Sequence, residues 1–511
     1  MAANLKAPMW QPTLTLPNGD SPRPQKGIVV FSGGSAANSL VELFNAIAEQ
    51  HSSNLSYVIP ISDNGGSTSE LIRVLGGPGI GDLRSRLVRL IPDSDVPGAE
   101  AHAIKLLFNH RLPNDCETAR REWLDIVEAK HDLWDHISSP KKELIRSFLI
   151  TVSLEIVKRL RPTSRFDFSK ASIGNLFLTG YVLTNTLTRS PADRGSARLF
   201  TGSLESAIYL LSSICAVPSS ISVLPAINTN FSHHISAGLA DGTTITGQNN
   251  ISHPSIGLDA VPGYITAFED SYEESDKIED ANLPGTLPTL RASQINFTKT
   301  VNPSLALQTD GAANQPVTAS DDLPHRITRL WYISPYGAEI RLPANPRVLS
   351  ALSSSSAVIY SIGSLYTSLV PSLILRGVGT TIMTTASIRS KILILNGSND
   401  RETGPSRTAF TALDFVQAIA DACVQSQGRP HAEPTELRSC VSHVVYMDGP
   451  GVPRVDREAL AKVGVEAIKT HGRRTSDGEI RYDPDALGGA LGMVLGRRTF
   501  GDRSRRNTLE H

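Results

Sequence analysis

The sequence predicts an α/β protein with a doubly wound, mainly parallel sheet that is interrupted by a helical insertion and by a flexible acidic insert. Short runs of β-branched and apolar residues alternate with helical patterns, as expected for consecutive βαβ units. Several of these runs end in turns that contain glycine and serine. With 511 residues, of which 40% are hydrophobic, the chain can also bury a large core.

The first two strand–helix units show this alternation most clearly. GIVVF at 27–31 has the composition of a buried parallel strand, and the SGGS turn after it leads into a helix whose cap would be Asn38 or Ser39. SYVIPIS at 56–62 is the next strand, and it ends in DNGGS before a second helix. Two strands that are each followed by a glycine turn and a helix indicate a parallel sheet.

The rest of the chain continues the pattern with two interruptions. Residues from about 99 to 165 form a long, charged, helical stretch, which we interpret as an insertion. Residues 255–325 are acidic in part and rich in Pro, Thr, Asn and Ala, which predicts a flexible surface insert. ADGTTITG (240–247) predicts a hairpin or a bulged turn, because Asp-Gly adopts positive φ readily. Further strand-like runs begin at residues 221, 327, 357 and 391.

The two ends of the chain read as tails. Residues 1–25 are rich in proline and contain no apolar run, which predicts a disordered segment and neither a signal peptide nor a membrane helix. Residues 497–511 carry several arginines and form either a solvated end or a targeting or anion-binding tail. No later stretch has the apolar length of a membrane span. We therefore expect a cytoplasmic protein.

The composition argues against two kinds of partner. Lys and Arg number 49 and Asp and Glu number 50, so no net basic charge points to a nucleic-acid binder. Aromatic residues make up only 6%, which leaves few rings to stack on bases. The four cysteines form no C-x-x-C pair and predict reduced, mostly buried thiols. We expect neither a nucleic acid nor a membrane as partner.

Four strand ends share a chemistry that suits phosphate. They are SGGS, SDNGGS, SIGS and LNGSND, at 32–35, 62–67, 361–364 and 395–400. In a doubly wound sheet such turns lie at the carboxyl edge, where glycine lets the backbone approach a ligand and helix N-termini attract anions. Each turn by itself is also compatible with an ordinary connection. None matches a Walker loop or G-x-G-x-x-G, which disfavours a standard NTPase or a dinucleotide dehydrogenase.

Two polar positions in these patterns could contact a nucleotide directly. The Asp63 carboxylate could hold Mg²⁺ against a diphosphate, with Asn64 as a neutral oxygen ligand. Alternatively, both residues only shape an Asx turn, and the local sequence leaves the two readings open. Asn175 lies near the start of an apolar helix, where a side-chain amide needs a backbone or ligand partner.

A basic helix is predicted to follow the Gly-Pro loop of GGPGIGDLRSRLVRL (76–90). Asp82 is placed to cap this helix. Arg84, in its first turn, is the best candidate to clamp a phosphate. Arg86 and Arg89 are expected to form a solvated face.

Taken together, these pieces resemble the CofD/YvcK superfamily, which includes the 2-phospho-L-lactate transferases and the gluconeogenesis factors. DNGGS, the GD-x-R step, SIGN and GSLYTS look closer to the YvcK branch. The first loop departs from the family pattern, because it reads SGGSAAN where a Thr-Gly pair usually follows the glycines. The matching segments occur in family order: VVFSGGSAANSL (29–40), ISDNGGSTSELIRVLGGPGIGDLRSRLVRL (61–90), SIGNLFLTG (172–180), VLPA (223–226), LADGTTITGQ (239–248), IGSLYTSLVPSLILRGV (362–378), LNGSNDRETG (395–404) and RYDPDAL (481–487).

The resemblance implies a single Rossmann-like domain over 26–496 that binds a nucleotide or a nucleotide sugar through its turns. On this basis Asp63, Asp82 and Arg84 are the candidate catalytic residues, and Asp63 is also the candidate metal ligand. The candidate nucleotide-binding residues come from the glycine turns and the SIGN helix: Gly33, Gly34, Ser35, Asn38, Asn64, Gly65, Gly66, Ser172, Gly174, Asn175, Gly363, Ser364, Tyr366, Thr367 and Asn396.

Two functions stay open. The first is an enzyme like 2-phospho-L-lactate transferase, in which Mg²⁺ assists transfer of a phospho-acyl group from a nucleoside diphosphate carrier to an alcohol. The second is a non-catalytic regulator that binds a nucleotide sugar such as UDP-N-acetylglucosamine. Both predict a small-molecule partner of the GDP, GMP or UDP-sugar type, with a homodimer left open.

Overall fold

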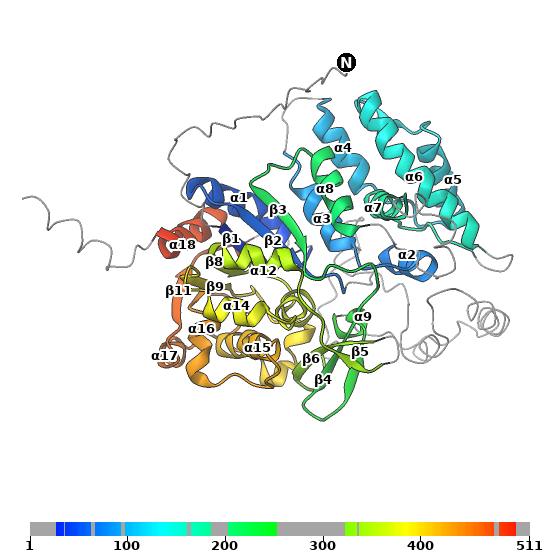
Figure 1. Ribbon diagram of the computed structural model, residues 1–511. Coiled ribbons are helices and arrows are strands. Elements are labelled where there is room, and N and C mark those ends of the chain that lie inside the picture. Colours follow the sequence, from blue (N-terminus) through cyan, green and yellow to red (C-terminus); the bar gives the residue numbers. More distant parts are fainter. Residues whose placement is uncertain are drawn as a thin grey trace, which may run out of the picture.

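A seven-stranded sheet with the strand order β11-β10-β9-β8-β1-β2-β3 lies at the centre of the protein (Figure 1). The computed structural model describes residues 27–34, 36–62, 67–92, 98–160, 165–184, 203–252, 322–334, 337–474 and 480–496. The strands of this sheet are β1 (Gly27–Phe31), β2 (Leu55–Ile59), β3 (Ile221–Pro225), β8 (Ser355–Tyr360), β9 (Ser390–Ile394), β10 (His443–Met447) and β11 (Glu466–Thr470). All neighbouring strands pair in parallel, which confirms the predicted Rossmann-like α/β fold.

Helices cover the sheet and explain why its strands read as apolar runs. All five residues of β1 are buried, as expected for a parallel strand that is covered on both faces. Helices α1 (Val41–Gln50) and α18 (Pro484–Gly496) pack against each other, and α12 (Pro346–Ser353), α14 (Val378–Thr384) and α15 (Ala412–Gln425) form a second group (Figure 1). The right-handed rule for parallel crossovers places these two groups on opposite faces.

The direction of winding reverses between β1 and β8. From β1 the chain proceeds outward through β2 to β3, and it then returns to place β8 on the other side of β1. The connections that leave the carboxyl ends of β1 and β8 therefore diverge. In open α/β sheets a crevice forms at this point, and ligands bind there.

The stretch predicted to be helical, residues 99–165, is mainly helical in its described part, which ends at 160 and resumes at 165. It contains α4 (Glu100–Asn109), α5 (Cys116–Val127) and α6 (Ser139–Arg159), and α6 packs along α7 (Ile173–Thr184). Trp123 and Trp134 are each 1% exposed and anchor this bundle. The bundle forms a layer beside the β3 edge of the sheet (Figure 1).

A second, antiparallel sheet has the order β5-β4-β6-β7. Its strands are β4 (His234–Leu239), β5 (Thr244–Thr246), β6 (Ile327–Ile333) and β7 (Glu339–Ile340). The turn between β4 and β5 contains Gly242 at a φ of 86°, which confirms the hairpin predicted at 240–247. The pairing of β4 with β6 was not predicted from the sequence, because most of the 255–325 segment separates them.

The remaining described elements connect these layers. They are α2 (Ser67–Leu75), α3 (Gly81–Arg89), α8 (Leu204–Ile214), α9 (Gln248–Ser252), α13 (Val370–Leu373), α16 (Leu437–Cys440), α17 (Arg457–Lys462), the hairpin strands β12 (Gly472–Arg474) and β13 (Ile480–Tyr482), and the short helical turns η1 (Ala36–Leu40), η2 (Asp132–Trp134), η6 (Leu365–Leu369), η7 (Arg401–Thr403), η8 (Ser406–Thr408) and η9 (Pro434–Glu436).

The predicted cap of the first helix is wrong. Residues 36–40 already form the 3₁₀ turn η1, so α1 has Leu40 at its N-cap position without a side-chain cap. Asn38 Nδ2 instead donates to Ser85 Oγ (2.8 Å), and Ser39 Oγ donates to Ala36 O (2.9 Å). A helix that starts as a 3₁₀ turn shifts the capping position downstream.

Three predictions of organisation fall on residues outside the described ranges. They are the disordered tail at 1–25, the basic tail at 497–511, and the flexible insert at 255–325 except for its last four residues. None of the helices in the described ranges combines the length and apolar composition that crossing a membrane requires.

Candidate functional site

Three of the four predicted turns meet at the carboxyl edge of the central sheet. Ser361 N, directly after β8, donates to Phe31 O at the end of β1 (3.0 Å). Asn396, after β9, joins the β8 turn, because its side chain accepts from Gly363 N (3.1 Å) and donates to Gly363 O (2.8 Å). Hydrogen bonds therefore join the turns after β1, β8 and β9 at this edge of the sheet.

The β1 turn (32–34) carries two buried amides without a protein acceptor. Gly33 and Gly34 are both buried, and neither amide donates a hydrogen bond within the described part of the chain. The Ser361 hydroxyl beside them is 1% exposed and likewise has no partner there. Buried backbone donors are nearly always paired in folded proteins, so these groups point to a ligand oxygen.

Close packing explains why this turn contains two glycines. A Cβ on Gly34 would lie 2.1 Å from Asp82 Oδ1 and 2.9 Å from Asp82 Cα, and a Cβ on Gly33 would lie 2.5 Å from Ser368 Oγ. Helix α3 thus abuts the turn from one side, and η6 from the other. Asp82 does not cap α3 as predicted, because Ile80 occupies the N-cap and no side chain caps the helix. The Asp82 carboxylate lies against Gly34 instead.

Arg86 lies beneath the β1 turn, which overturns the prediction that it faces solvent. Its side chain is fully buried and donates to Gly33 O (3.0 Å), Ser32 Oγ (3.2 Å) and Ala37 O (3.2 Å). The guanidinium also lies 4.7 Å from the centre of the Tyr57 ring. Burial lowers the pKa of Arg86 to about 10, so the group keeps its charge at neutral pH.

Arg84 joins the SIGN helix in a second buried polar cluster. Its Nε donates to Asn175 Oδ1 (3.2 Å), and Asn175 Nδ2 donates to Thr68 Oγ1 (3.4 Å). A Cβ on Gly174 would lie 2.8 Å from the Arg84 side chain, so this glycine makes room for it. The structure therefore brings together three predicted site residues and gives the buried Asn175 amide its partners. Burial also lowers the pKa of Arg84 to about 10.

The β8 turn (361–364) and the start of η6 differ from the expectation that they hold phosphate. The amides of Tyr366 and Thr367 donate to Glu402 Oε2 (2.9 and 3.0 Å), and the Thr367 hydroxyl donates to Glu402 Oε1 (2.5 Å). The Gly363 amide already donates to Asn396. Ser364 follows Gly363 and is also a hydrogen-bond partner of Asp400. Acceptors from the protein itself thus take donors that were assigned to a ligand: Glu402 takes those of Tyr366 and Thr367, and Asn396 takes that of Gly363.

Glu402 was not among the predicted site residues. It is 1% exposed, and burial together with the neighbouring Asp400 carboxylate raises its pKa to about 8. In the sequence Glu402 belongs to RETG, which reads as an ordinary polar helix start. Its signal was the run of polar residues in LNGSNDRETG, which is too long for a simple connection.

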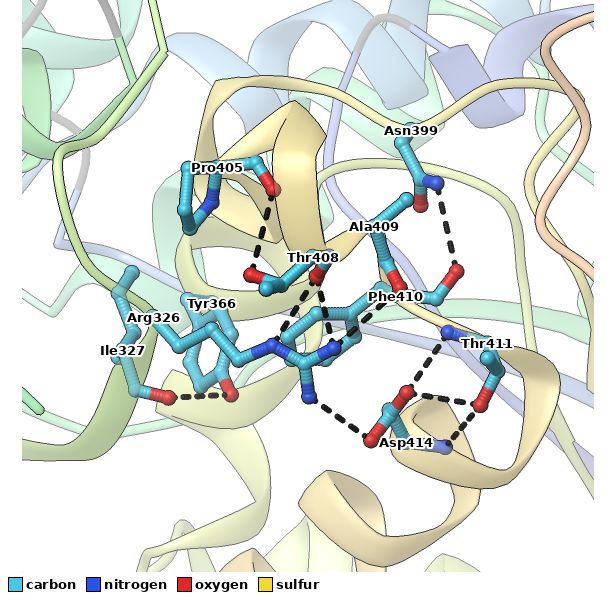
Figure 2. Close-up of polar contacts among 10 residues, drawn as sticks. All are labelled: Arg326, Ile327, Tyr366, Asn399, Pro405, Thr408, Ala409, Phe410, Thr411 and Asp414. Carbon is cyan, nitrogen blue, oxygen red and sulfur yellow. Dashed lines mark hydrogen bonds and ion pairs between the residues drawn. The ribbon is translucent and has the colours of Figure 1, made fainter.

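The loop that delivers Glu402 is held by a network around Arg326 (Figure 2). Arg326 Nη1 pairs with Asp414 Oδ1 (3.0 Å), Nη2 donates to Thr408 O (2.7 Å), and the guanidinium lies 4.9 Å from the Phe410 ring centre. Asn399 Nδ2 donates to Phe410 O (3.3 Å). Helix α15 begins after this network, at Ala412, and the short turns η7 and η8 precede it.

Several predicted site residues fall outside the described ranges. They are Ser35, Asp63, Asn64, Gly65 and Gly66. Among the residues that the structure does describe, no group of three or more His, Cys, Asp or Glu side chains is arranged to hold a metal ion. Asp63, the predicted magnesium ligand, lies outside these residues, so its role stays a prediction. Ser172, the remaining predicted site residue, is buried directly before α7.

Comparisons with known proteins agree with this fold. A family model described as 2-phospho-L-lactate transferase CofD matches residues 28–472. The uncharacterized protein YNL011C of Saccharomyces cerevisiae is 37% identical over 475 residues, which cover 88% of this chain and 96% of that protein. A putative gluconeogenesis factor of Clostridium acetobutylicum is 24% identical over 272 residues, which cover 50% of this chain and 54% of that protein.

Solved structures show the same architecture. Two crystal structures of the Bacillus halodurans protein BH3568 cover 91% of this chain and 99% of their own, at 18% sequence identity and TM-scores of 0.51 and 0.52. One of them is described as a member of the UPF0052 family. At this identity the match supports the fold.

Proposed function

The chain belongs to the 2-phospho-L-lactate transferase CofD family, and we propose that it binds a nucleoside-diphosphate-type ligand at the carboxyl edge of its central sheet. One observation carries the proposal. The amides of Gly33 and Gly34 are buried and have no acceptor within the described ranges, at the point where the winding of the sheet reverses. Phosphate oxygens are the acceptors that such amides commonly bind.

The charges around the β1 turn support an anionic ligand. Arg84 and Arg86 are buried cations with pKa values of about 10, and the negative charge of Asp82 raises the pKa of both. Asp82 is the only carboxylate among the described residues that raises the pKa of either arginine, so the described part of this group has a positive surplus. A buried positive charge is unfavourable without compensation, and a bound diphosphate would provide it.

The reaction we propose for this site is transfer of a phospho-acyl group from a nucleotide carrier to an alcohol. The alcohol oxygen would bond to phosphorus and lose its proton to solvent, and the bond from phosphorus to the departing nucleoside monophosphate would break. The protein would position the phosphates and neutralise their charge through the β1 turn and Arg84. Asp63 would hold Mg²⁺, which would neutralise further diphosphate charge when bound.

A second candidate function is binding of a nucleotide sugar without turnover. The similarity to a putative gluconeogenesis factor favours it, since the same turns would hold the diphosphate of a UDP-sugar. Both candidates place the diphosphate at the β1 turn. They differ in whether a product forms.

Calorimetric titration with GDP, GMP and UDP-N-acetylglucosamine tests both candidates. We expect at least one diphosphate ligand to bind, and mass spectrometry of the mixture with Mg²⁺ and an alcohol acceptor then separates transferase from regulator. Asp63→Ala should abolish turnover while the melting temperature changes little, whereas Asp448→Ala, at an exposed position, should leave both unchanged. Failure to bind any of the three ligands would contradict both functions.

A further inference from the structure

Arg86 has an unusual set of partners for a buried cation. All three of its hydrogen-bond acceptors lie in one short stretch: Ser32 Oγ, Gly33 O and Ala37 O, at 3.0–3.2 Å. No carboxylate within the described ranges lies close enough to Arg86 to form an ion pair. The charge of this side chain is thus directed at the backbone of the β1 turn and of η1.

The contact with Gly33 O fixes the direction of the next amide. In a trans peptide the C=O and the N–H point in opposite directions. The peptide between Gly33 and Gly34 is trans, and its oxygen accepts from Arg86 Nη2. The Gly34 N–H therefore points away from the guanidinium, toward the opposite side of the turn. Arg86 also polarises this peptide, which strengthens the Gly34 amide as a donor.

We propose that Arg86 is the positioning residue of the anion site. It holds the Gly33–Gly34 peptide in the orientation that presents the Gly34 amide to a phosphate group, and it places a buried positive charge behind that amide. This inference rests on the proposed function, because it assigns a role within the same diphosphate site.

The shape of the arginine side chain explains why a lysine could not take this role fully. A guanidinium is a planar fork that can reach several acceptors from one fixed position. Arg86 uses two terminal nitrogens to bridge three acceptors on two parts of the turn. A lysine ammonium at the same place would keep the charge and would lose this simultaneous contact.

The test compares three variants with inorganic pyrophosphate, inorganic phosphate and uncharged guanosine and uridine as probes. Arg86→Met removes the charge and the hydrogen bonds, and Arg86→Lys keeps the charge. Arg89→Met is the matched control, because Arg89 lies on the same helix and donates to Asn38 O, but its side chain is 30% exposed. Melting curves without ligand check that each variant folds.

We expect Arg86→Met to weaken pyrophosphate binding by about 10- to 100-fold, a range typical for hydrogen bonds that involve charged groups. Phosphate should weaken less, and nucleoside binding should not change. A purely structural role would weaken all probes alike. Arg86→Lys should fall between the wild type and Arg86→Met, and Arg89→Met should stay within about twofold of the wild type.

The possible outcomes distinguish the proposed function from the proposed role of Arg86. If the wild type binds neither pyrophosphate nor any nucleotide, the proposed function fails, and the role of Arg86 fails with it. If the wild type binds pyrophosphate and Arg86→Met binds it equally well, only the inference about Arg86 fails. If Arg86→Met does not fold, Arg86→Lys carries the test. Full wild-type pyrophosphate affinity in that variant, or an equal loss for nucleosides, overturns the inference.

Discussion

The β1 turn and the β8 turn lie side by side and contain similar residues, yet a buried cation lies beneath the first and a buried carboxyl group of raised pKa lies beneath the second. Arg86 donates to the carbonyl of Gly33, so the Gly34 amide faces away from it, and neither glycine amide of the β1 turn has a protein acceptor within the described ranges. Glu402 accepts from the amides of Tyr366 and Thr367, so the donors after β8 are already paired. A ligand can therefore accept hydrogen bonds from the β1 turn, whereas the amides that follow β8 already have an acceptor in the protein.

This difference shows that a glycine-serine turn does not by itself define an anion site. SGGS and SIGS suggest the same chemistry in the sequence. The side chain packed behind each turn decides which backbone groups remain available. A buried cation leaves the amides for an external anion, whereas the oxygen of a buried carboxyl group takes them.

Of the substitutions considered for the two turns, Gly34→Ala should reduce pyrophosphate affinity the most. The added Cβ would lie 2.1 Å from Asp82 Oδ1 and 2.9 Å from Asp82 Cα, so rotation of the Asp82 side chain alone cannot relieve the clash. The turn must shift and its two amides lose their alignment with the ligand, so we expect pyrophosphate affinity to fall by about 100-fold, which corresponds to about 3 kcal/mol of charge-assisted hydrogen bonding. Calorimetric titration measures this loss.

Gly492→Ala in α18 is the matched control. An added Cβ there meets no atom within 4 Å, and alanine favours a helix over glycine by about 1 kcal/mol. This variant should bind like the wild type and melt at the same or a higher temperature. Unchanged affinity in Gly34→Ala would show that the β1 turn does not contact the ligand.

A smaller effect is expected at the β8 turn, where titration of Glu402 should make the stability of the protein depend on pH. Burial raises the pKa of Glu402 from its ordinary 4.5 to about 8, so the folded state holds this proton more tightly than the unfolded chain. The resulting stability is complete below pH 4.5 and is lost as the pH rises toward 8. Glu402→Gln removes this titration and keeps a side-chain oxygen for the two amides.

We therefore expect Glu402→Gln to gain stability relative to the wild type as the pH rises from 6 to 8, by about 1.4 kcal/mol per pH unit at most. Melting temperatures at several pH values measure the difference. Glu458→Gln, at an exposed position on α17, should show no such trend. A constant difference between Glu402→Gln and the wild type across this range would show that Glu402 titrates at an ordinary pH.

The sequence predicted the sheet well because of how parallel strands are buried. GIVVF at 27–31 coincides with β1, and ISVLPA at 221–226 begins where β3 begins. Strands that are covered on both faces must be apolar throughout, and this pattern is local. The pairing of β4 with β6 was not predicted, because it depends on residues far apart in the chain.

The same distinction between local and distant information separates the site residues. Asn175 was found because it interrupts an apolar helical pattern and Arg84 because it lies in the first turn of a basic helix, and the structure pairs them. Arg86 was assigned to solvent because a second arginine two positions on reads as the opposite, polar face of the helix. Helix α3 is enclosed instead, with Leu83, Leu87 and Val88 also buried, and only tertiary packing determines that.

A crystal structure of the protein with inorganic pyrophosphate would show whether the β1 turn binds the anion. Our account predicts pyrophosphate oxygens within hydrogen-bond distance of the Gly33 and Gly34 amides, with Glu402 still bound to Tyr366 and Thr367. A pyrophosphate that displaces the Glu402 carboxylate and binds the Tyr366 and Thr367 amides, or one that contacts neither turn, would contradict it.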